Sequence, residues 1–393
     1  MNLIVIEEEK IQHNINIIKE KVKNITDDNG VSPKIIAVLK GNAYGMGIIN
    51  VAKKLLDNNI DFFAVTEIAE AIELRNSGFN NEILVLNSTC IKEEVEQIVD
   101  KNLIATVGSI EALNMLNEVA KNKQKVINYH LKIDTGFCRF GFDANKIVNS
   151  KVMNERLVEE CECENNLLEK LTNSIKSSNN IKLTGTYSHF QESYANDDKM
   201  TRKQFNIFLD VISKLKSANI NPGMLHICNS SAFFKYKEMY MNAVRIGSAL
   251  TGRLQISNTT GLQRVGYLES EICDIKYVKK GQKIGYSGTY EIKKDTKTAV
   301  VEAGYFDGVG VTGPKDSVRL IDKIRAIKRD LIALSKDGTR YVEINEKRYP
   351  ILGRIGMKNF MIDISNENVQ IGEKIKIDIN LVLANQNIKR ELR

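Results

Sequence analysis

The chain has 393 residues, of which 42% are hydrophobic and 27% charged, a composition typical of a globular protein with a sizeable core. Its 56 basic and 49 acidic residues leave a net charge of +7 but form no long basic block, which argues against a nucleic-acid partner. The six cysteines form no C-x-x-C framework, and neither a signal peptide nor a long apolar span is recognisable, so we expect a cytoplasmic protein with no metal site and no membrane span.

The first part of the chain alternates between short apolar runs and helical patterns. A strand is predicted at 1–7 and a helix at 11–22. Eight apolar runs, each ending in a polar residue or glycine, are then predicted as strands, at 35–39, 62–66, 83–86, 104–107, 129–133, 183–187, 225–228 and 243–246. Amphipathic helices are predicted between them, at 51–56, 67–75, 93–99, 110–119 and 204–215. This alternation predicts an α/β fold, a parallel (β/α)8 barrel of the TIM type at residues 11–250.

After residue 252 the pattern changes to strands punctuated by glycine turns, without regular helices between them. These strands are predicted at 269–276, 283–290, 298–303, 351–364 and 374–383. They predict a second, mostly antiparallel β domain at residues 251–393, which we expect the N-terminal strand within residues 1–10 to join.

Two stretches stand apart from both patterns. Residues 149–178 are rich in Glu, Asn, Lys and Ser and are predicted as a surface insertion, and residues 318–334 have the apolar spacing of an amphipathic helix. Surface decoration and a partner site are both open as their roles.

The apolar run at 35–39 ends in Lys40 and a glycine-rich turn, K-G-N-A-Y-G-M-G. The carboxyl ends of barrel strands are where active sites lie. A lysine at such a partly dry strand end can have a lowered pKa, which frees its amine to bond with a carbonyl compound or a pyridoxal cofactor. The alternative is a surface lysine whose stem lies along the protein.

Other polar residues also follow predicted barrel strands. They are Lys132 and Arg139 after the fifth strand, His189 after the sixth, His226, Asn229 and Ser230 after the seventh, and Arg245 and Gly247 after the eighth. Alone, each could be a satisfied core histidine or a salt-bridged arginine. Together with Lys40 they meet at one barrel mouth, where Ser230 and the amides near Gly247 can hold a phosphate.

Eight motifs that occur in order along nearly the whole chain resemble those of the pyridoxal-phosphate-dependent alanine racemases. They are A-V-L-K-G-N-A-Y-G-M-G, K-I-D-T-G-F-C-R-F-G-F, T-Y-S-H-F, H-I-C-N-S, V-R-I-G, I-G-Y-S-G-T-Y, G-Y-F-D-G and G-R-I-G-M. Each motif alone is weak, but eight in sequence are specific. The resemblance implies a pyridoxal 5'-phosphate (PLP) cofactor and an isomerase that interconverts L- and D-alanine.

By this resemblance, Lys40 binds PLP covalently and serves as one catalytic base. Tyr305, in G-Y-F-D-G, matches the second base, and the family's homodimer delivers it from the other subunit into a shared active site. Two bases are needed because racemisation takes a proton from one face of Cα and returns one to the other. The expected partners are therefore a small amino-acid substrate and a second copy of the chain.

The resemblance also assigns residues to the cofactor and the substrate. Tyr44, Ser230, Gly247 and Ser248 bind the phosphate, Arg245 faces the pyridine nitrogen, and His189 is counted among the cofactor-binding residues. Arg139 faces the phenolic oxygen and, with Met357, the substrate, and Lys132, often carbamylated in the family, orients Arg139. An arginine at the pyridine nitrogen, in place of a carboxylate, leaves that nitrogen unprotonated. The cofactor is then a weaker electron sink, which disfavours side reactions such as transamination.

The chain departs from the family at two further positions. Lys358 stands where the family usually has aspartate, and this charge reversal beside Met357 could change substrate choice or access. The family's C-terminal tyrosine is replaced by Gln386 or Asn387, which could lower cofactor affinity or rate.

Three alternatives to alanine racemisation stay open. A serine or other amino-acid racemase would need only small changes in the pocket, since a hydroxymethyl differs little in size from a methyl. A non-catalytic PLP-binding protein would keep the barrel but lack the β domain. A related amino-acid decarboxylase would place a cysteine near the cofactor, and none lies in the matching loops of the β domain.

Overall fold

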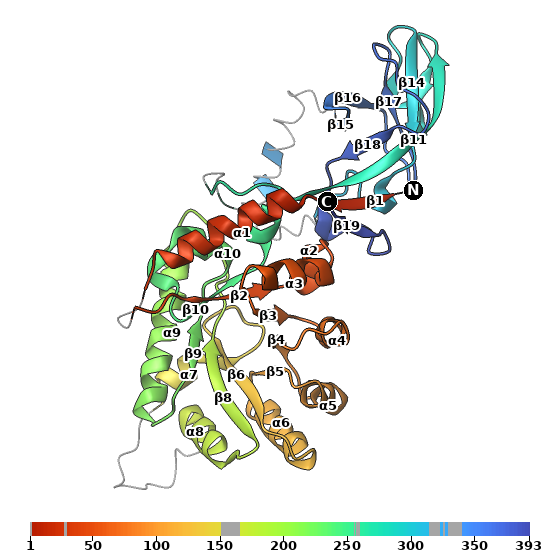
Figure 1. The fold of residues 1–393 in the computed structure, drawn as a ribbon. Helices are drawn as coiled ribbons and strands as arrows, with labels where there is room; N and C mark the ends of the chain where they lie inside the picture. The colour runs from red at the N-terminus through yellow and green to blue at the C-terminus, as the bar shows by residue number, and fades with distance from the viewer. Residues whose placement is uncertain are drawn as a thin grey trace, which may run out of the picture. The chain divides into compact units, whose positions relative to one another are not determined.

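The computed structural model describes residues 2–26, 30–150, 166–254, 256, 260–313, 323–324, 327–328 and 340–393. The chain divides into two compact units, Glu9–Arg264 and the combination of Met1–Glu8 with Val265–Arg393 (Figure 1). Most of the predicted helix at 318–334, and residues 151–165 of the predicted insertion, lie outside the described residues.

The unit Glu9–Arg264 contains the predicted parallel barrel. Its eight main strands are adjacent in the order β10-β2-β3-β4-β5-β6-β8-β9. Their bounds are β2 (Lys34–Val38), β3 (Phe62–Val65), β4 (Glu82–Ser88), β5 (Ile104–Val107), β6 (Ile127–Asp134), β8 (Ile181–Tyr187), β9 (Met224–His226) and β10 (Ala243–Ile246), and a short β7 (Phe142–Asp143) extends β6. Between β9 and β10, two backbone hydrogen bonds bridge the remaining gap, from Asn242 N to Leu225 O (3.1 Å) and from Arg245 N to Cys228 O (2.9 Å). The (β/α)8 prediction is confirmed.

Helices alternate with the strands, and most of them lie on the outer side of the barrel (Figure 1). Their bounds are α1 (Glu8–Lys23), α2 (Lys40–Tyr44), α3 (Ile48–Asp57), α4 (Ile68–Asn76), α5 (Lys92–Asp100), α6 (Ile110–Asn122), α7 (Ala144–Val148), α8 (Leu167–Ser177), α9 (Lys199–Ser217) and α10 (Ser230–Lys235). Helix α6 shows why they form: Ser109 Oγ caps its first turn by accepting from Ala112 N (3.2 Å). Leu113 and Leu116, three residues apart, are buried on one face of this helix.

The barrel interior is filled by alternate residues of the strands, because successive side chains of a strand point to opposite faces. One buried cluster comprises Ile36, Val38, Phe62, Ala64, Leu84, Ile104 and Ala243. The spacing of two within β2 and β3 places these side chains on the inner face.

The other unit is a mostly antiparallel β domain, which confirms that prediction. Its strands are adjacent in the order β14-β17-β16-β15-β18-β11-β1-β19, and β14 also pairs with β11. Their bounds are β1 (Leu3–Ile6), β11 (Gly266–Val278), β14 (Thr296–Val301), β15 (Tyr341–Ile344), β16 (Lys347–Leu352), β17 (Phe360–Asp363), β18 (Lys374–Ile377) and β19 (Arg390–Leu392). The N-terminal strand β1 lies between β11, to which it is antiparallel, and β19, to which it is parallel.

Three predicted strands of this unit are wrong in their extent. Residues 283–290 form β12 (Lys283–Ile284), a 3-10 turn (Tyr286–Gly288) and β13 (Tyr290–Glu291); residues 351–364 hold the end of β16 and all of β17; and residues 374–383 hold β18 and a 3-10 turn (Leu381–Leu383). Gly285 and Gly353 both have φ near 70°, a left-handed conformation that ends an extended run. The Asn380 side chain caps the last turn by accepting from Val382 N.

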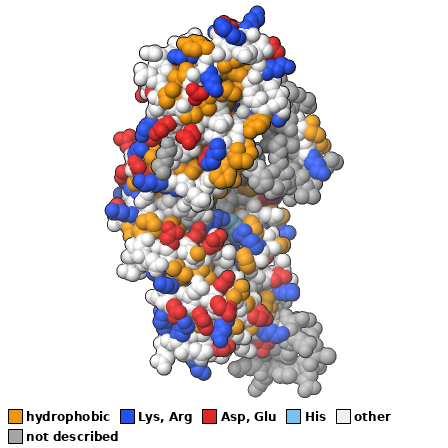
Figure 2. Space-filling model, turned by 90° about the vertical axis from the view of Figure 1, so that its right-hand side faces the viewer, with side chains coloured by type: hydrophobic (Ala, Val, Ile, Leu, Met, Phe, Trp, Pro, Cys, Tyr) orange, Lys and Arg blue, Asp and Glu red, His pale blue; other side chains and the backbone are white. Residues whose placement is uncertain are grey.

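Basic and acidic side chains lie intermixed on the face shown in Figure 2, as their distribution along the sequence indicates. In the described part of the chain, no helix has the length and apolar character needed to span a bilayer.

Candidate active site

The predicted site residues of the barrel unit meet at one cavity of about 410 Å³. The cavity is lined by Lys40, Tyr44, Lys132, Arg139, His189, Ser230, Arg245, Gly247 and Ser248. These residues follow or end different strands, so the barrel brings together side chains that are more than 200 residues apart in the sequence.

Lys40 and Tyr44 are presented by an unusual left-handed turn. Within α2, residues Gly41, Asn42 and Ala43 have φ of 62°, 55° and 52°, and Tyr44 follows with 55°. For residues other than glycine this conformation costs about 1–2 kcal/mol each. The turn is held by hydrogen bonds from Asn42 N to a carboxylate oxygen of Glu70 (3.1 Å) and from Ile48 N to Asn42 Oδ1 (2.7 Å).

The electrostatic surroundings favour a neutral amine at Lys40. Burial and the nearby Arg139 lower the pKa of Lys40, against a smaller opposing effect of Glu70. A neutral amine carries the lone pair that covalent bonding to a carbonyl carbon requires. The sequence-based hypothesis for this lysine therefore has a physical basis in the folded chain.

A second group of residues forms a cradle suited to a phosphate. Ser230 Oγ accepts from the backbone N–H groups of Gly247 (3.0 Å) and Ala249 (3.4 Å). A Cβ atom on Gly247 would lie 2.5 Å from the Tyr44 hydroxyl, so glycine is needed for this approach. Burial raises the pKa of Tyr44 to about 12, and its hydroxyl therefore stays a neutral donor.

Arg245 is held from behind by two histidines. Its NH1 donates to His226 Nδ1 (2.8 Å), its NH2 donates to His189 Nδ1 (3.1 Å), and His226 Nε2 lies 2.9 Å from His130 Nδ1. A guanidinium only donates, so His226 Nδ1 is an acceptor and the ring proton lies on Nε2. His226 in turn donates to His130. Among the described residues, Arg245 Nε has no acceptor, which leaves one donor for a ligand in the cavity.

All three histidines are neutral at physiological pH. Burial, followed by Arg245, holds the pKa of His226 and His189 well below their usual range and lowers that of His130 to about 3. Burial also lowers the pKa of Arg245, to about 10, so this guanidinium stays positive. The Arg245 guanidinium is therefore a fixed positive charge whose neighbouring histidines are uncharged.

Lys132 is a buried amine without an ion-pair partner among the described residues. Its residue is 7% exposed, and its Nζ lies 4.3 Å from the centroid of the Tyr187 ring. Burial, then Arg245 and Arg139, hold the pKa of Lys132 well below its usual range, with Asp134 opposing them. These surroundings favour the uncharged, nucleophilic form of the amine.

The loop that carries Arg139 is shaped by the Asp134 carboxylate. Asp134 Oδ1 accepts from the backbone N–H groups of Gly136 (2.9 Å), Phe137 (2.8 Å) and Cys138 (3.1 Å). The guanidinium of Arg139 then lies 4.5 Å from the centroid of the Phe137 ring. The K-I-D-T-G-F-C-R motif is therefore a turn built around one carboxylate.

Sequence reasoning missed two residues of this site, His130 and Tyr187. The Tyr187 ring stacks on the His226 ring at 4.8 Å and its hydroxyl donates to Leu86 O (3.0 Å). Strand alternation could have identified both residues. His130 lies two residues before Lys132 and Tyr187 two residues before His189, and alternate residues of a strand point to the same face.

In the β unit, the structure brings the predicted residues Tyr305 and Met357 together. Tyr305 N donates to Gly356 O (3.0 Å) and Phe306 N donates to Met357 O (3.2 Å). A Cβ atom on Gly304 would lie 2.2 Å from Met357 O, so glycine is needed there too. The side chains of Tyr305 and Met357 remain half exposed.

The two departures from the family pattern also lie in this unit. Lys358 Nζ pairs with Asp307 Oδ1 at 2.9 Å, a contact that the sequence did not predict. Gln386 and Asn387 lie in a polar turn, where Arg390 donates to Gln386 O (2.6 Å).

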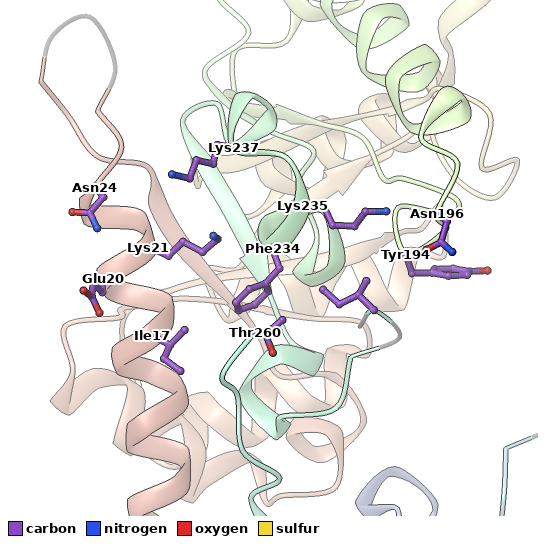
Figure 3. Close-up of a pocket in the computed structure, with 11 residues that line it drawn as sticks. Ile17, Glu20, Lys21, Asn24, Tyr194, Asn196, Phe234, Lys235, Lys237 and Thr260 are labelled. Atoms are coloured by element: carbon purple, nitrogen blue, oxygen red, sulfur yellow. The ribbon is translucent and has the colours of Figure 1, made fainter. Parts of the chain in front are cut away.

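A separate cavity of about 480 Å³ lies between α1, α10 and the loop before α9 (Figure 3). Lys21, Lys235, Lys237 and Phe234 line it, and none of the predicted site residues does. Burial and the neighbouring Lys237 lower the pKa of Lys21. In the described part of the chain, no group of three or more His, Cys, Asp or Glu could hold a metal ion.

Comparisons with known proteins agree on one family. The model of the alanine racemase N-terminal domain matches residues 6–156 and 163–255, and that of the C-terminal domain matches residues 265–386. An alanine racemase of Methanococcus maripaludis is 30% identical over 368 residues, which cover 92% of this chain and 87% of the relative. One of Clostridium tetani is 31% identical over 361 residues, 91% of this chain and 81% of the relative.

Solved structures show the same relationship. The alanine racemase of Clostridium difficile 630 aligns with a TM-score of 0.79 and 25% identity, covering 100% of this chain and 95% of that chain. The two family models together match residues in both units. The chain belongs to the alanine racemase family.

Proposed function

We propose that this protein is a PLP-dependent alanine racemase that uses Lys40 and Tyr305 as its two bases. The observation that carries the proposal is the meeting of nine sequence-predicted residues at one cavity that contains an amine of lowered pKa. The match to both family domains argues against a PLP carrier that lacks the β domain.

The barrel cavity fits PLP on features of this chain alone. The Gly247 cradle, with the hydroxyls of Tyr44 and Ser230 beside it, suits the phosphate, and Lys40 suits the aldehyde carbon. Ser248 lines the same end of the cavity. When bound, PLP acidifies the Cα proton of an attached amino acid and spreads the resulting charge over its ring.

The chain's own residues then move the protons. The amine of Lys40, whose pKa is lowered, would accept the Cα proton on one face, and the Tyr305 hydroxyl would exchange a proton on the other. Arg245, with its unused Nε donor, would meet the pyridine nitrogen, and a fixed cation there disfavours protonation of that nitrogen. Arg139 and the backbone of Met357 would hold anionic oxygens of the cofactor and the substrate.

For Lys132 we propose carbamylation. The uncharged amine forms a C–N bond with carbon dioxide and releases one proton, which places a carbamate anion at this buried position. The product would be balanced by Arg139 and Arg245, the two cations that lower the pKa of Lys132. Carbon-13 NMR of protein kept in labelled bicarbonate would show this adduct in the wild type and not in Lys132→Ala.

We further propose that the active protein is a homodimer whose subunits share active sites. Tyr305 is 51% exposed and lies among other exposed apolar side chains of the β unit, Phe306 (52%), Met357 (54%) and Tyr286 (72%). Such a patch suits burial against a second copy. Residues 11–250 would then act as the cofactor-binding domain, and residues 251–393 with 1–10 as the domain that supplies Tyr305.

A cytoplasmic location belongs to the same proposal. The described cysteines with assigned states, Cys90, Cys138, Cys228 and Cys273, are free thiols, which favours a reducing compartment.

The proposed activity is tested by incubating PLP-loaded protein in deuterated water with L-alanine or L-serine. We expect loss of optical rotation together with deuterium at Cα, faster for alanine. The same signals for serine alone would make serine the substrate. Cofactor binding without either signal for alanine or serine would contradict the proposed racemisation.

A further inference from the structure

The turn that carries Tyr305 is held by a buried carboxylate. The Asp307 side chain is 2% exposed; its Oδ2 accepts from Gly304 N (3.0 Å) and its Oδ1 accepts from Lys358 Nζ (2.9 Å). The same Nζ lies 4.4 Å from the centroid of the Phe306 ring. Lys358 therefore contacts the two residues that follow Tyr305.

The two residues of this pair differ in burial: Asp307 is buried, whereas Lys358 is half exposed and can be replaced without disturbing the core. The Asp307 carboxylate is desolvated, and a buried carboxylate needs a cation or several hydrogen-bond donors to stabilise its charge. Of the described residues, Lys358 is the one cation within ion-pair distance of it. The Lys358 side chain is itself 54% exposed, so replacing it leaves no unfilled space in the core.

We propose that Lys358 is a positioning residue for Tyr305. By neutralising Asp307 and lying over Phe306, it fixes the Gly304–Gly308 turn and hence the direction of the Tyr305 hydroxyl. The charge reversal relative to the family would thus act on the second base and not on substrate choice. This inference rests on the proposed role of Tyr305.

The proposed role makes a kinetic prediction that a general loss of stability does not. Lys40 and Tyr305 serve opposite faces of Cα, so a loosened turn slows only the proton transfer made by Tyr305. Because the two enantiomers have equal free energy, kcat/KM must fall equally in both directions. The isotope effect of Cα-deuterated alanine, however, should rise in the direction in which Tyr305 removes the deuteron and fall in the other.

The variants are Lys358→Gln, which removes the charge, Lys358→Arg, which keeps it, and Lys374→Gln as a matched control. Lys374 forms an ion pair in the same unit, 2.9 Å from Glu269, with side chains 60% and 11% exposed, and Glu269 also pairs with Arg393 at 2.8 Å. For Lys358→Gln we expect about a tenfold loss of kcat with KM little changed, and isotope effects that diverge between directions. Lys358→Arg should restore wild-type values, and Lys374→Gln should keep them.

A second readout does not depend on activity. The PLP-loaded protein is prepared with fluorotyrosine, and the Tyr305 resonance is assigned by its loss in Tyr305→Phe. Lys358→Gln should move or broaden that fluorine resonance, and Lys374→Gln should not. Unchanged isotope effects, or an unchanged Tyr305 resonance, in folded Lys358→Gln would overturn the proposal. A wild-type protein that binds PLP without racemising alanine would refute the proposed function, while the fluorine signal would still report on the turn.

Discussion

Because Gly247 has no side chain, the Tyr44 ring can approach its backbone closely. In Gly247→Ala the new Cβ would lie 2.5 Å from the Tyr44 hydroxyl, so the ring must move out of the cradle. We expect PLP affinity to fall roughly tenfold or more, at least about 1.4 kcal/mol of binding free energy. Absorbance titration of the apoprotein with PLP measures it.

Gly313 provides the control for this substitution. A Cβ there would meet no heavy atom of the described residues within 4 Å, and its backbone is not in the left-handed region. Gly313→Ala should therefore bind PLP like the wild type. Equal affinity of Gly247→Ala and the wild type would show that the cradle does not hold the cofactor.

The buried histidines make stability depend on pH. The pKa of His130 is about 3 in the folded chain, against an ordinary value near 6.5, so the unfolded state binds more protons between these limits. The contribution of His130 is therefore complete above pH 6.5 and is lost as pH falls below it, by about 1.4 kcal/mol per pH unit. His226 and His189 act with the same sign.

This effect is measured by urea unfolding of wild type and His130→Gln at pH 7.5 and 5.5. The variant has no titrating ring at position 130, so its loss of stability between the two pH values should be smaller than that of the wild type by about 1.4 kcal/mol. An identical loss in both proteins would mean that His130 takes up the same number of protons in the folded and unfolded states, so that folding does not lower its pKa.

At the scale of elements, the left-handed backbone of α2 positions Lys40 and Tyr44 in the cavity. Asn42 has a left-handed φ of 55°, and its side chain accepts from Ile48 N. Asn42→Ala should cost about 1–2 kcal/mol of stability from backbone strain, and it should also lower PLP affinity because Lys40 and Tyr44 are displaced.

Asn102 offers a matched control, since it also has a left-handed φ, 48°, at the end of α5. Asn102→Ala should lose comparable stability in thermal unfolding yet keep normal PLP affinity. If both variants bound PLP equally well, the left-handed turn would be a folding feature without influence on the cofactor.

The sequence predicted those elements whose periodicity is local and regular. The barrel strands and helices follow from apolar spacing, and the site residues follow from their place at strand ends. The turns within 283–290 and 351–364 were missed because the sequence does not distinguish a glycine that ends a strand from a glycine inside one. The left-handed conformation of the α2 turn and the Lys358–Asp307 pair were missed because both depend on contacts between residues distant in sequence.

At the scale of the whole molecule, the proposed shared site predicts complementation. Lys40→Ala and Tyr305→Phe should each have very low activity as separate proteins. If each site takes Lys40 from one subunit and Tyr305 from its partner, co-expression yields heterodimers with one intact site. Random pairing should then recover about a quarter of the wild-type activity. Activity no higher than that of the separate variants would exclude a shared site.

The place of β1 has a consequence for synthesis on the ribosome. Its residues pair with Gly266–Glu269 and with β19, whereas the barrel unit is the continuous segment Glu9–Arg264. The barrel can therefore fold as soon as it has left the exit tunnel, while the first strand must wait for partners made some 260 to 390 residues later. In the nascent chain, β1 should be open to protease until the end of translation, long after the barrel has become resistant.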